Sequence, residues 1–436
     1  MSGPLPRLLR RLPRDASFHV FLATVLLCLF RSRQLPNVDV SLGGTELELG
    51  PADLGLAATG VLALVRLRAV RPLPSPWLLA AAVVFAALLV VSSLPNGADA
   101  ISAALKLAAL AALTLGAVAF VHSRSELAVV TGALVLFATV AAGWGLVEFV
   151  RGGGGRQGSF MGEHDLAALG TMTAVAGLAY LYARPGRMPH LALVGTVAGA
   201  VAVTIGASLA SLIGVYLASA ALVALAAVRG RLRLVPVAAT LAVAVAVTAG
   251  TWAIRGGEFG FLQSWFGPPP ETPGQYAASW SQRLIFAYIG GRIFLDSPVL
   301  GTGWHGVLPE EEFAHYLPDA RERFSDQPLH YFPEPEAGFV PQQTYDQVLF
   351  ELGVLGIGVL AVTTLLALRS AAAAGKAWPR GGAYEEQAFV PLAWLASLAG
   401  VLAGAALFGG TPIAAIFWLT LGIVAVAPRL AGAEAA

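Results

Sequence analysis

Three stretches of polar side chains interrupt an otherwise apolar chain, each at the edge of a hydrophobic segment. The first, residues 158–167 (GSFMGEHDLA), follows Arg156 and runs into a hydrophobic segment at Asp165. A carboxylate at that point suits a helix N-terminus, where it accepts hydrogen bonds from free backbone N–H groups. The same helix start is a natural anion site, with Arg156 and His164 beside it. A structural cap and a site for a lipid-linked pyrophosphate are therefore both open for this stretch.

The second stretch, residues 281–303 (SQRLIFAYIGGRIFLDSPVLGTG), carries two arginines in a partly apolar sequence. Guanidinium groups bind phosphate oxygens through paired N–H donors. Arg283 and Arg292 are nine residues apart, so at 100° per residue they point in opposite directions on one continuous helix. The two are not expected to hold one phosphate together. Pro298 and the glycines after it predict a tight loop, which follows a helix at the outer membrane interface.

The third stretch, residues 341–356 (PQQTYDQVLFELGVLG), begins another hydrophobic segment. Ionisable residues inside membrane spans are costly and are functional candidates by default. Asp346 is close enough to the start of the segment to be a helix cap, whereas Glu351 lies one to two turns deeper. Lys106, inside a different apolar segment, either extends its amine to the interface or pairs with a carboxylate such as Glu148.

The composition places these stretches in a membrane protein. The chain has 436 residues, of which 57% are hydrophobic and 12% are charged, whereas soluble domains carry about 25% charged residues. The net charge of +1 gives no reason to expect a nucleic-acid partner. The single cysteine, Cys28, cannot form an internal disulfide or a cysteine metal cluster, so cysteine usage does not indicate the redox compartment.

Hydrophobic segments predict an all-α polytopic protein with about twelve transmembrane helices and one large extracytoplasmic loop containing short helices. A spanning helix needs about 20 mostly apolar residues, and the first two segments are short. The N-terminus resembles a signal peptide but lacks a small-x-small cleavage site, so we expect an uncleaved first span. The predicted spans are residues 16–31, 51–67, 75–94, 98–121, 127–149, 165–183, 190–206, 208–228, 233–254, 345–368, 388–408 and 411–428.

Arginine and lysine concentrate in alternate connections, as the positive-inside rule requires when both termini are cytoplasmic. This predicts a nine-helix bundle at residues 1–254, an extracytoplasmic loop at 255–344 and a three-helix bundle at 345–436. A loop of this length is usually functional or disordered, and its tryptophans and histidines favour a functional one. Arg156 and Arg283 run against the charge bias by lying outside.

The three stretches, in this order, resemble the motifs of the O-antigen ligase and polymerase superfamily of bacterial envelope glycosyltransferases. Its members show a G-[ST]-F-x-x-x-N/H-[DE]-x-A loop, then an arginine followed by D-x-P-[LV]-x-G-x-G. A third motif, H-N-x-[YF]-x-x-x-L-x-E-x-G-x-x-G, opens the next helix. The counterparts here are GSFMGEHDLA, Arg283 with DSPVLGTG, and QQTYDQVLFELGVLG, within residues 150–360.

The resemblance implies transfer of a glycan from undecaprenyl diphosphate to a hydroxyl acceptor, either a glycan or a lipid. The reaction would occur on the extracytoplasmic face of the bacterial inner membrane, without a metal, cofactor or nucleotide sugar. By this resemblance Arg156 and Arg283 would bind the diphosphate. We also count Arg292, Gln342 and Tyr345 among its candidate contacts.

One departure from the family pattern leaves the general base open. The chain has Gln342 where ligases of the family have a histidine, and glutamine cannot act as a base. Candidates for that role are Glu351, His330 and His164. The span around Ser208 also lacks the Ser-Arg pair that many relatives carry. The alternatives are a transporter or flippase of a lipid-linked glycan and a non-catalytic envelope scaffold.

Overall fold

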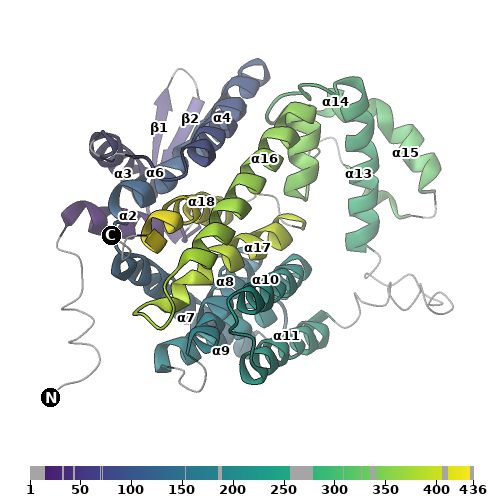
Figure 1. Cartoon of the computed structure of the whole chain (residues 1–436). Helices are drawn as coiled ribbons and strands as arrows, with labels where there is room; N and C mark the ends of the chain where they lie inside the picture. The colour runs from purple at the N-terminus through teal and green to yellow at the C-terminus, as the bar shows by residue number, and fades with distance from the viewer. Residues whose placement is uncertain are drawn as a thin grey trace.

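The computed structural model shows a helical protein with one short β-hairpin (Figure 1). In the hairpin, β1 (Val38–Leu42) pairs antiparallel with β2 (Thr45–Leu49), with Val38 opposite Leu49. The structure describes residues 15–31, 34–42, 45–68, 70, 72–152, 154–184, 189–255, 278–307, 309–325, 327–333, 339, 341–404 and 411–432.

Long apolar helices account for most of the described chain. The N-terminal half contains α2 (Ala16–Leu27), α3 (Pro51–Leu67), α4 (Pro76–Ser93), η2 (Leu94–Asn96), α5 (Gly97–Ala109), α6 (Ala111–Phe120), α7 (Arg124–Arg151), α8 (Glu163–Ala183), α9 (His190–Gly206), α10 (Leu209–Val228) and α11 (Leu234–Arg255). The C-terminal half contains α13 (Ala278–Asp296), α14 (Glu310–Phe313), η3 (Ala314–Tyr316), α15 (Leu317–Arg323), η4 (Leu329–Tyr331), α16 (Thr344–Ala377), η5 (Glu385–Ala388), α17 (Val390–Leu402) and α18 (Thr411–Gly432).

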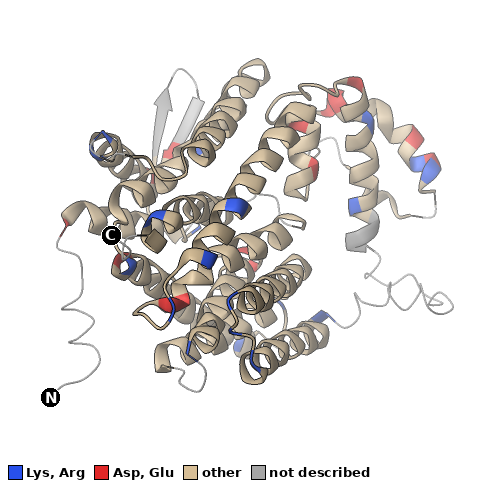
Figure 2. Ribbon diagram, in the orientation of Figure 1, with Lys and Arg blue, Asp and Glu red and all other residues tan. Residues whose placement is uncertain are grey.

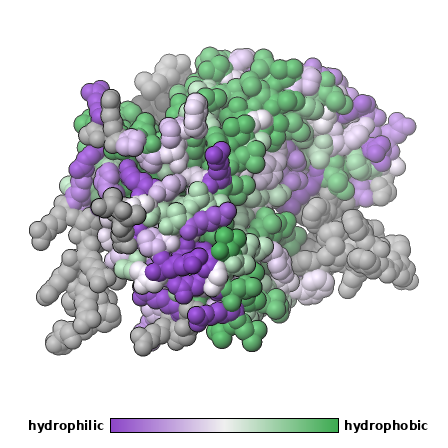
Figure 3. Space-filling model, in the orientation of Figure 1, coloured by the Kyte–Doolittle hydropathy of each residue, from purple (hydrophilic) through white to green (hydrophobic). Residues whose placement is uncertain are grey.

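The helices have the length and surface of membrane spans. Seven helical stretches in the described chain are long and apolar enough to cross a bilayer, with Pro76–Phe120 counted as one, and α2, α9 and α17 are shorter apolar helices. Figure 3 shows apolar side chains over wide areas of one face, and large apolar side chains such as Leu241 and Leu365 are more than 60% exposed. This confirms a helical membrane protein in contact with lipid. The number twelve and the sidedness remain predictions.

Two helices, α8 and α18, form the interior of the bundle, since about nine-tenths of the apolar window of each is buried. Helix α8 packs against α9, α10 and α17, and α18 packs against α6 and α16. The residues after α11 build a separate small core, in which Ile285, Ile289 and Ile293 of α13 contact Phe313 and Phe339. Charged residues are frequent on α14 and α15 (Figure 2), so the described residues between α13 and α16 form a folded unit that combines an apolar core with charged helices.

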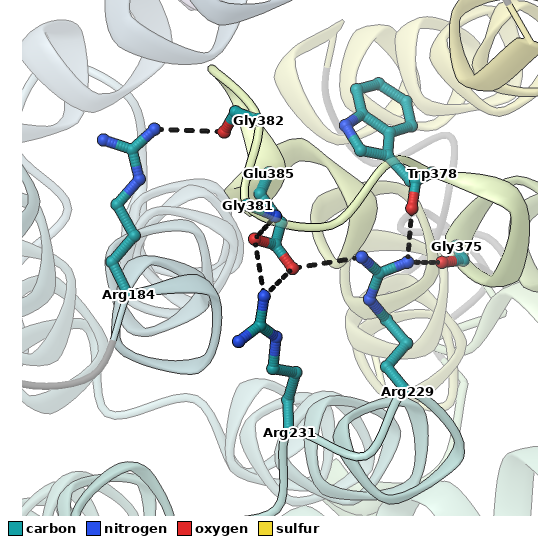
Figure 4. A network of polar contacts seen from close by, with 8 residues as sticks. All are labelled: Arg184, Arg229, Arg231, Gly375, Trp378, Gly381, Gly382 and Glu385. Atoms are coloured by element: carbon teal, nitrogen blue, oxygen red, sulfur yellow. Dashed lines mark hydrogen bonds and ion pairs between the residues drawn. The ribbon is translucent and has the colours of Figure 1, made fainter. Parts of the chain in front are cut away.

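A buried ion-pair network joins the end of α10 to the connection between α16 and α17 (Figure 4). The side chains of Arg229 and Glu385 are each 1% exposed and lie 3.1 Å apart. Arg231 donates to both carboxylate oxygens of Glu385 at 3.1 Å, and the backbone N–H of Gly381 donates at 2.6 Å. Arg229 also donates to the carbonyl of Trp378 at 3.0 Å. The network therefore fastens the end of α10 to the connection before α17.

Helix α16 is broken at Gly353, whereas the sequence predicted one uninterrupted span at 345–368. Gly353 has φ 62° and ψ −160°, a region that is essentially open to glycine alone. A broken helix frees backbone groups that the bilayer cannot satisfy, so other protein must cover them. The loop after α13 covers them through four backbone hydrogen bonds. The loop donates two of them, from Thr302 to Phe350 O at 3.3 Å and from Gly303 to Glu351 O at 2.8 Å. Helix α16 donates the other two, from Val354 to Pro298 O at 2.9 Å and from Leu355 to Val299 O at 3.2 Å. The second and third polar stretches of the sequence therefore form one structural element.

We expect Gly353→Ala to destabilise the protein by at least about 1–3 kcal/mol, the cost of one residue held in a disfavoured backbone region. A Cβ at Gly353 would also lie 2.5 Å from the backbone of Val299. The measurement is the midpoint of thermal unfolding of the detergent-purified protein. Gly358→Ala is the matched control, because a Cβ there meets nothing within 4 Å and alanine favours a helix. Equal midpoints for Gly353→Ala and Gly358→Ala would contradict the account of the break.

Candidate functional site

Arg156 lies at the junction where α9 ends and α10 begins. Its guanidinium pairs with Glu163, the first residue of α8, at 2.8 Å, and its Nε donates to the carbonyl of Gly206 at 3.3 Å. The backbone N–H of Gln157 donates to Ile205 O at 2.9 Å. The glycine-rich connection between α7 and α8 is thereby fastened to the end of α9.

Two further polar side chains converge on the same junction. Ala207 adopts the left-handed conformation (φ 43°), which ends α9 and leaves its last carbonyls without helical partners. Arg255, at the end of α11, donates to Ala207 O at 2.8 Å, as suits a cation at a helix C-terminus. The Nδ1 atom of His164 lies 3.1 Å from the hydroxyl of Ser208. Residues 206–208 thus place Arg156, Arg255 and His164 side by side.

Arg283 reaches the same region from α13. Its Nε donates to the side-chain oxygen of Gln342 at 3.4 Å, and its guanidinium donates to Gly404 O, beyond α17, at 3.3 Å. Burial lowers the pKa of Arg283 and the nearby charge of Arg156 lowers it further, while Asp346 acts in the opposite direction. The guanidinium stays charged because arginine does not lose its proton in proteins. The structure therefore brings Arg156 and Arg283 close enough to repel each other.

We define the arginine cluster as Arg31, Arg156, Arg255 and Arg283, which all interact electrostatically with the ring of His164. Among the residues that the structure describes, three carboxylates lie near this cluster. Glu163 pairs with Arg156, Asp165 lies 3.6 Å from Arg31, and Asp346 lies near Arg283. Four guanidinium groups gathered in one region can bind an anion through their N–H donors.

Asp165 and Asp346 are not helix caps in the structure. The N-cap of α8 is Gly162 and the N-cap of α16 is Gln343, and neither forms a side-chain cap bond. Asp165 is buried against Arg31, and Asp346 faces Arg283. Asp165 pairs with Arg31, and Asp346 lies close enough to Arg283 to act on its charge, which no local pattern in the sequence indicates.

Several predicted site residues lie outside the arginine cluster. Arg292 pairs with Asp319 at 2.9 Å, with both side chains about half exposed, and so points away from Arg283, as the spacing of nine residues predicted. His330 is exposed in η4, with its ring 4.5 Å from that of Tyr331.

Two others belong to α16. The hydroxyl of Tyr345 donates to Ala399 O of α17 at 3.0 Å, which fixes the start of α16 beside the cluster. Glu351 is fully buried and accepts a hydrogen bond from Gln347 at 3.1 Å. Its carboxyl also lies beside the backbone N–H of His305. Within the described part of the chain Glu351 forms no ion pair with an arginine, so its position is that of a support for the break in α16.

The possible pair of Lys106 with Glu148 is wrong. Lys106 donates to the carbonyl of Glu48 in β2 at 2.9 Å, while Glu148 accepts from the indole of Trp144 at 2.8 Å. The lysine amine extends to the protein edge instead.

Sequence reasoning missed Arg31 and Arg255 as partners of Arg156. Arg31 ends the predicted span 16–31 and Arg255 follows the predicted span 233–254, both on the side predicted to be poor in arginine, so the charge bias itself contained the signal. Among the residues that the structure describes, no three His, Cys, Asp or Glu side chains gather as a metal site would require. No protein-family model matches the chain, and no curated protein matches it.

Proposed function

We propose that the protein is a membrane glycosyltransferase that moves a glycan from undecaprenyl diphosphate to a hydroxyl acceptor, as a ligase or a polymerase. The observation that carries the proposal is the arginine cluster, in which four guanidinium groups from four separate segments lie close enough to His164 to act on its ring electrostatically. Such a group suits a diphosphate, whose oxygens accept paired N–H donors. In this proposal the site lies on the extracytoplasmic face of a bacterial inner membrane and both termini are cytoplasmic, as the resemblance implies and the charge pattern favours.

The reaction needs positive charge at the departing diphosphate. The acceptor hydroxyl oxygen attacks the anomeric carbon, the bond from that carbon to the diphosphate oxygen breaks, and its electrons leave with undecaprenyl diphosphate. Preorganised cations stabilise the charge that develops on this group. Arg156 and Arg283 fill that role, and Gln342 positions Arg283 through the bond between them. The ion pair of Arg156 with Glu163 is partly exposed, so it contributes little stability and a diphosphate can replace the carboxylate.

His164 is the proposed general base that takes the proton of the acceptor hydroxyl. Of the three side chains considered for this role it alone lies within the arginine cluster. Its Nδ1 bonds to Ser208, which orients the ring and leaves Nε2 for the acceptor. This assignment replaces the histidine that the family motif has at the position of Gln342.

The test of the function is a reconstitution assay with purified protein, an undecaprenyl-diphosphate glycan and a glycan acceptor. The proposal predicts a glycan-acceptor product together with release of undecaprenyl diphosphate. Movement of the intact lipid-linked glycan across proteoliposomes without product would identify a transporter. Stable binding of the lipid-linked glycan without turnover would identify a scaffold. Either result would refute the transferase.

In this assay we expect His164→Gln to lower transfer about 100-fold, at the lower end of what a general base contributes. Glutamine keeps a hydrogen bond to Ser208 within reach but cannot accept the proton. Binding of undecaprenyl diphosphate should be unchanged, which separates a lost base from a lost site. His330→Gln is the control, since His330 is exposed on η4. Equal transfer by wild type and His164→Gln would remove His164 from the mechanism.

A further inference from the structure

A second polar site lies next to the arginine cluster. It is a cavity of about 250 Å³ between the β-hairpin, the helices α3 and α5, the start of α18 and the loop at Trp304. Pockets for drug-sized ligands measure about 300–1,000 Å³, so this cavity suits a small unit. We define the hairpin cavity by six of its lining residues: Asn37, Glu48, Asp53, Lys106, Trp304 and His305.

The lining of the hairpin cavity offers donors and acceptors together. The Lys106 ammonium uses one N–H bond on Glu48 O and has three donors in all. Asp53 accepts from the backbone N–H of Gly50 through one oxygen, at 2.8 Å, and a carboxylate has further acceptor sites. Sugar hydroxyl groups both donate and accept, so they match this set. A phosphate, which only accepts when ionised, would meet two carboxylates.

An aromatic wall completes the cavity. The rings of Trp304 and His305 stack with centroids 4.9 Å apart and an angle of 29° between their planes, and Phe30 also lines the cavity. A sugar ring has polar edges and apolar faces, so a site that combines ring faces with hydrogen-bonding groups fits it. His305 also has a positive φ of 61°, and such strain in a non-glycine residue collects at functional sites.

The chain connects the hairpin cavity to the arginine cluster at two places. Phe30 lines the cavity, and the next residue, Arg31, belongs to the cluster. At the start of α18, Thr411 lines the cavity, while the backbone of Ile413 lies beside Asp165, the partner of Arg31. The cavity and the cluster are therefore joined through residues 30–31 and through the start of α18.

We infer that the hairpin cavity binds a sugar ring of the acceptor, and so holds the hydroxyl that the glycan is transferred to. This inference rests on the proposed function, which gives the acceptor its role. It separates two sites: the arginine cluster binds the anionic donor, and the hairpin cavity binds a saccharide. No charged group is required on the acceptor.

The test is protection of a thiol in the full-length purified protein. Ala103 lines the cavity, and the native Cys28 is buried, so wild type reports background labelling. The measurement is the rate at which a polar maleimide labels the A103C protein, with and without methyl glycosides of glucose, galactose or N-acetylglucosamine. We expect at least one glycoside to slow this labelling about fivefold in a saturable manner. A cysteine at Leu35 on the cavity wall gives a second reporter, and E322C on exposed α15 gives the control.

Glu48→Gln combined with Lys106→Met should abolish the protection of A103C. Three results would overturn the inference: no glycoside protects either reporter, protection persists in the double variant, or glycerol phosphate protects in place of the glycosides, as a lipid headgroup would. Protection without any glycan transfer in the reconstitution assay would refute the proposed function and leave a saccharide site. Glycan transfer without protection would refute the assignment of the hairpin cavity as the acceptor site and leave the proposed function standing.

Discussion

Replacing Arg156 and Arg283 together with alanine should lower glycan transfer about 1,000-fold or more while the protein still inserts and folds. Loss of a single preorganised group at a developing negative charge typically costs about 10²–10³-fold, and two groups on one diphosphate act on the same oxygens. Each single variant should lose about 100-fold. The measurement is the rate of undecaprenyl diphosphate release by purified variants at equal protein concentration.

Arg292→Ala is the matched control for this pair. Arg292 is on the same helix as Arg283, but it is half exposed and paired with Asp319. Transfer should remain within about twofold of wild type. If Arg292→Ala lost as much activity as Arg283→Ala, general positive charge on α13 would explain the effect, and the arginine cluster would have no special role.

Glu385→Ala should destabilise the protein by about 3–5 kcal/mol, the cost of breaking a buried ion pair by removing one partner. Arg229 would remain 1% exposed without its carboxylate, and Gly381 N–H and Arg231 would lose their acceptor as well. The expected observation is a lower midpoint of thermal unfolding in detergent, with aggregation at temperatures where wild type is monodisperse.

The comparison for Glu385 is Asp319→Ala. The pair of Asp319 with Arg292 has a similar distance of 2.9 Å, but both side chains are about half exposed. Exposed pairs contribute about 0–1 kcal/mol, so Asp319→Ala should change the midpoint little. Similar decreases of the unfolding midpoint in the two variants would show that burial does not determine how much the Glu385 network contributes to stability.

Local patterns in the sequence predicted the helices well because apolar length is a local property. Most predicted spans, such as 51–67 and 165–183, coincide with a single helix. The predicted span 98–121 is divided at Leu110 into α5 and α6, and the end of the predicted span 388–408 lies outside the described residues. The break at Gly353 could not be predicted, because it depends on the loop at Pro298 lying against α16. A glycine within an apolar helix is otherwise common in membrane spans.

The candidate site was predictable only as far as it depends on local properties of the sequence. The charge bias drew attention to Arg156 and Arg283, and helix periodicity separated Arg292 from Arg283. The addition of Arg31 and Arg255 depends on the contact of Arg31 with Asp165 of α8 and on the packing of α11 against α9, which are tertiary properties. Glu351 seemed catalytic because it is ionisable in an apolar segment, yet it contacts Gln347 and the backbone at His305.

The most direct test of the central claim is equilibrium binding of undecaprenyl diphosphate to the purified protein, compared with undecaprenol, which has the same chain and no phosphate. The arginine cluster predicts that wild type binds the diphosphate at least about 100-fold more tightly than the alcohol. The Arg156→Ala/Arg283→Ala protein should bind both alike. Equal affinity of wild type for the two lipids would contradict the account.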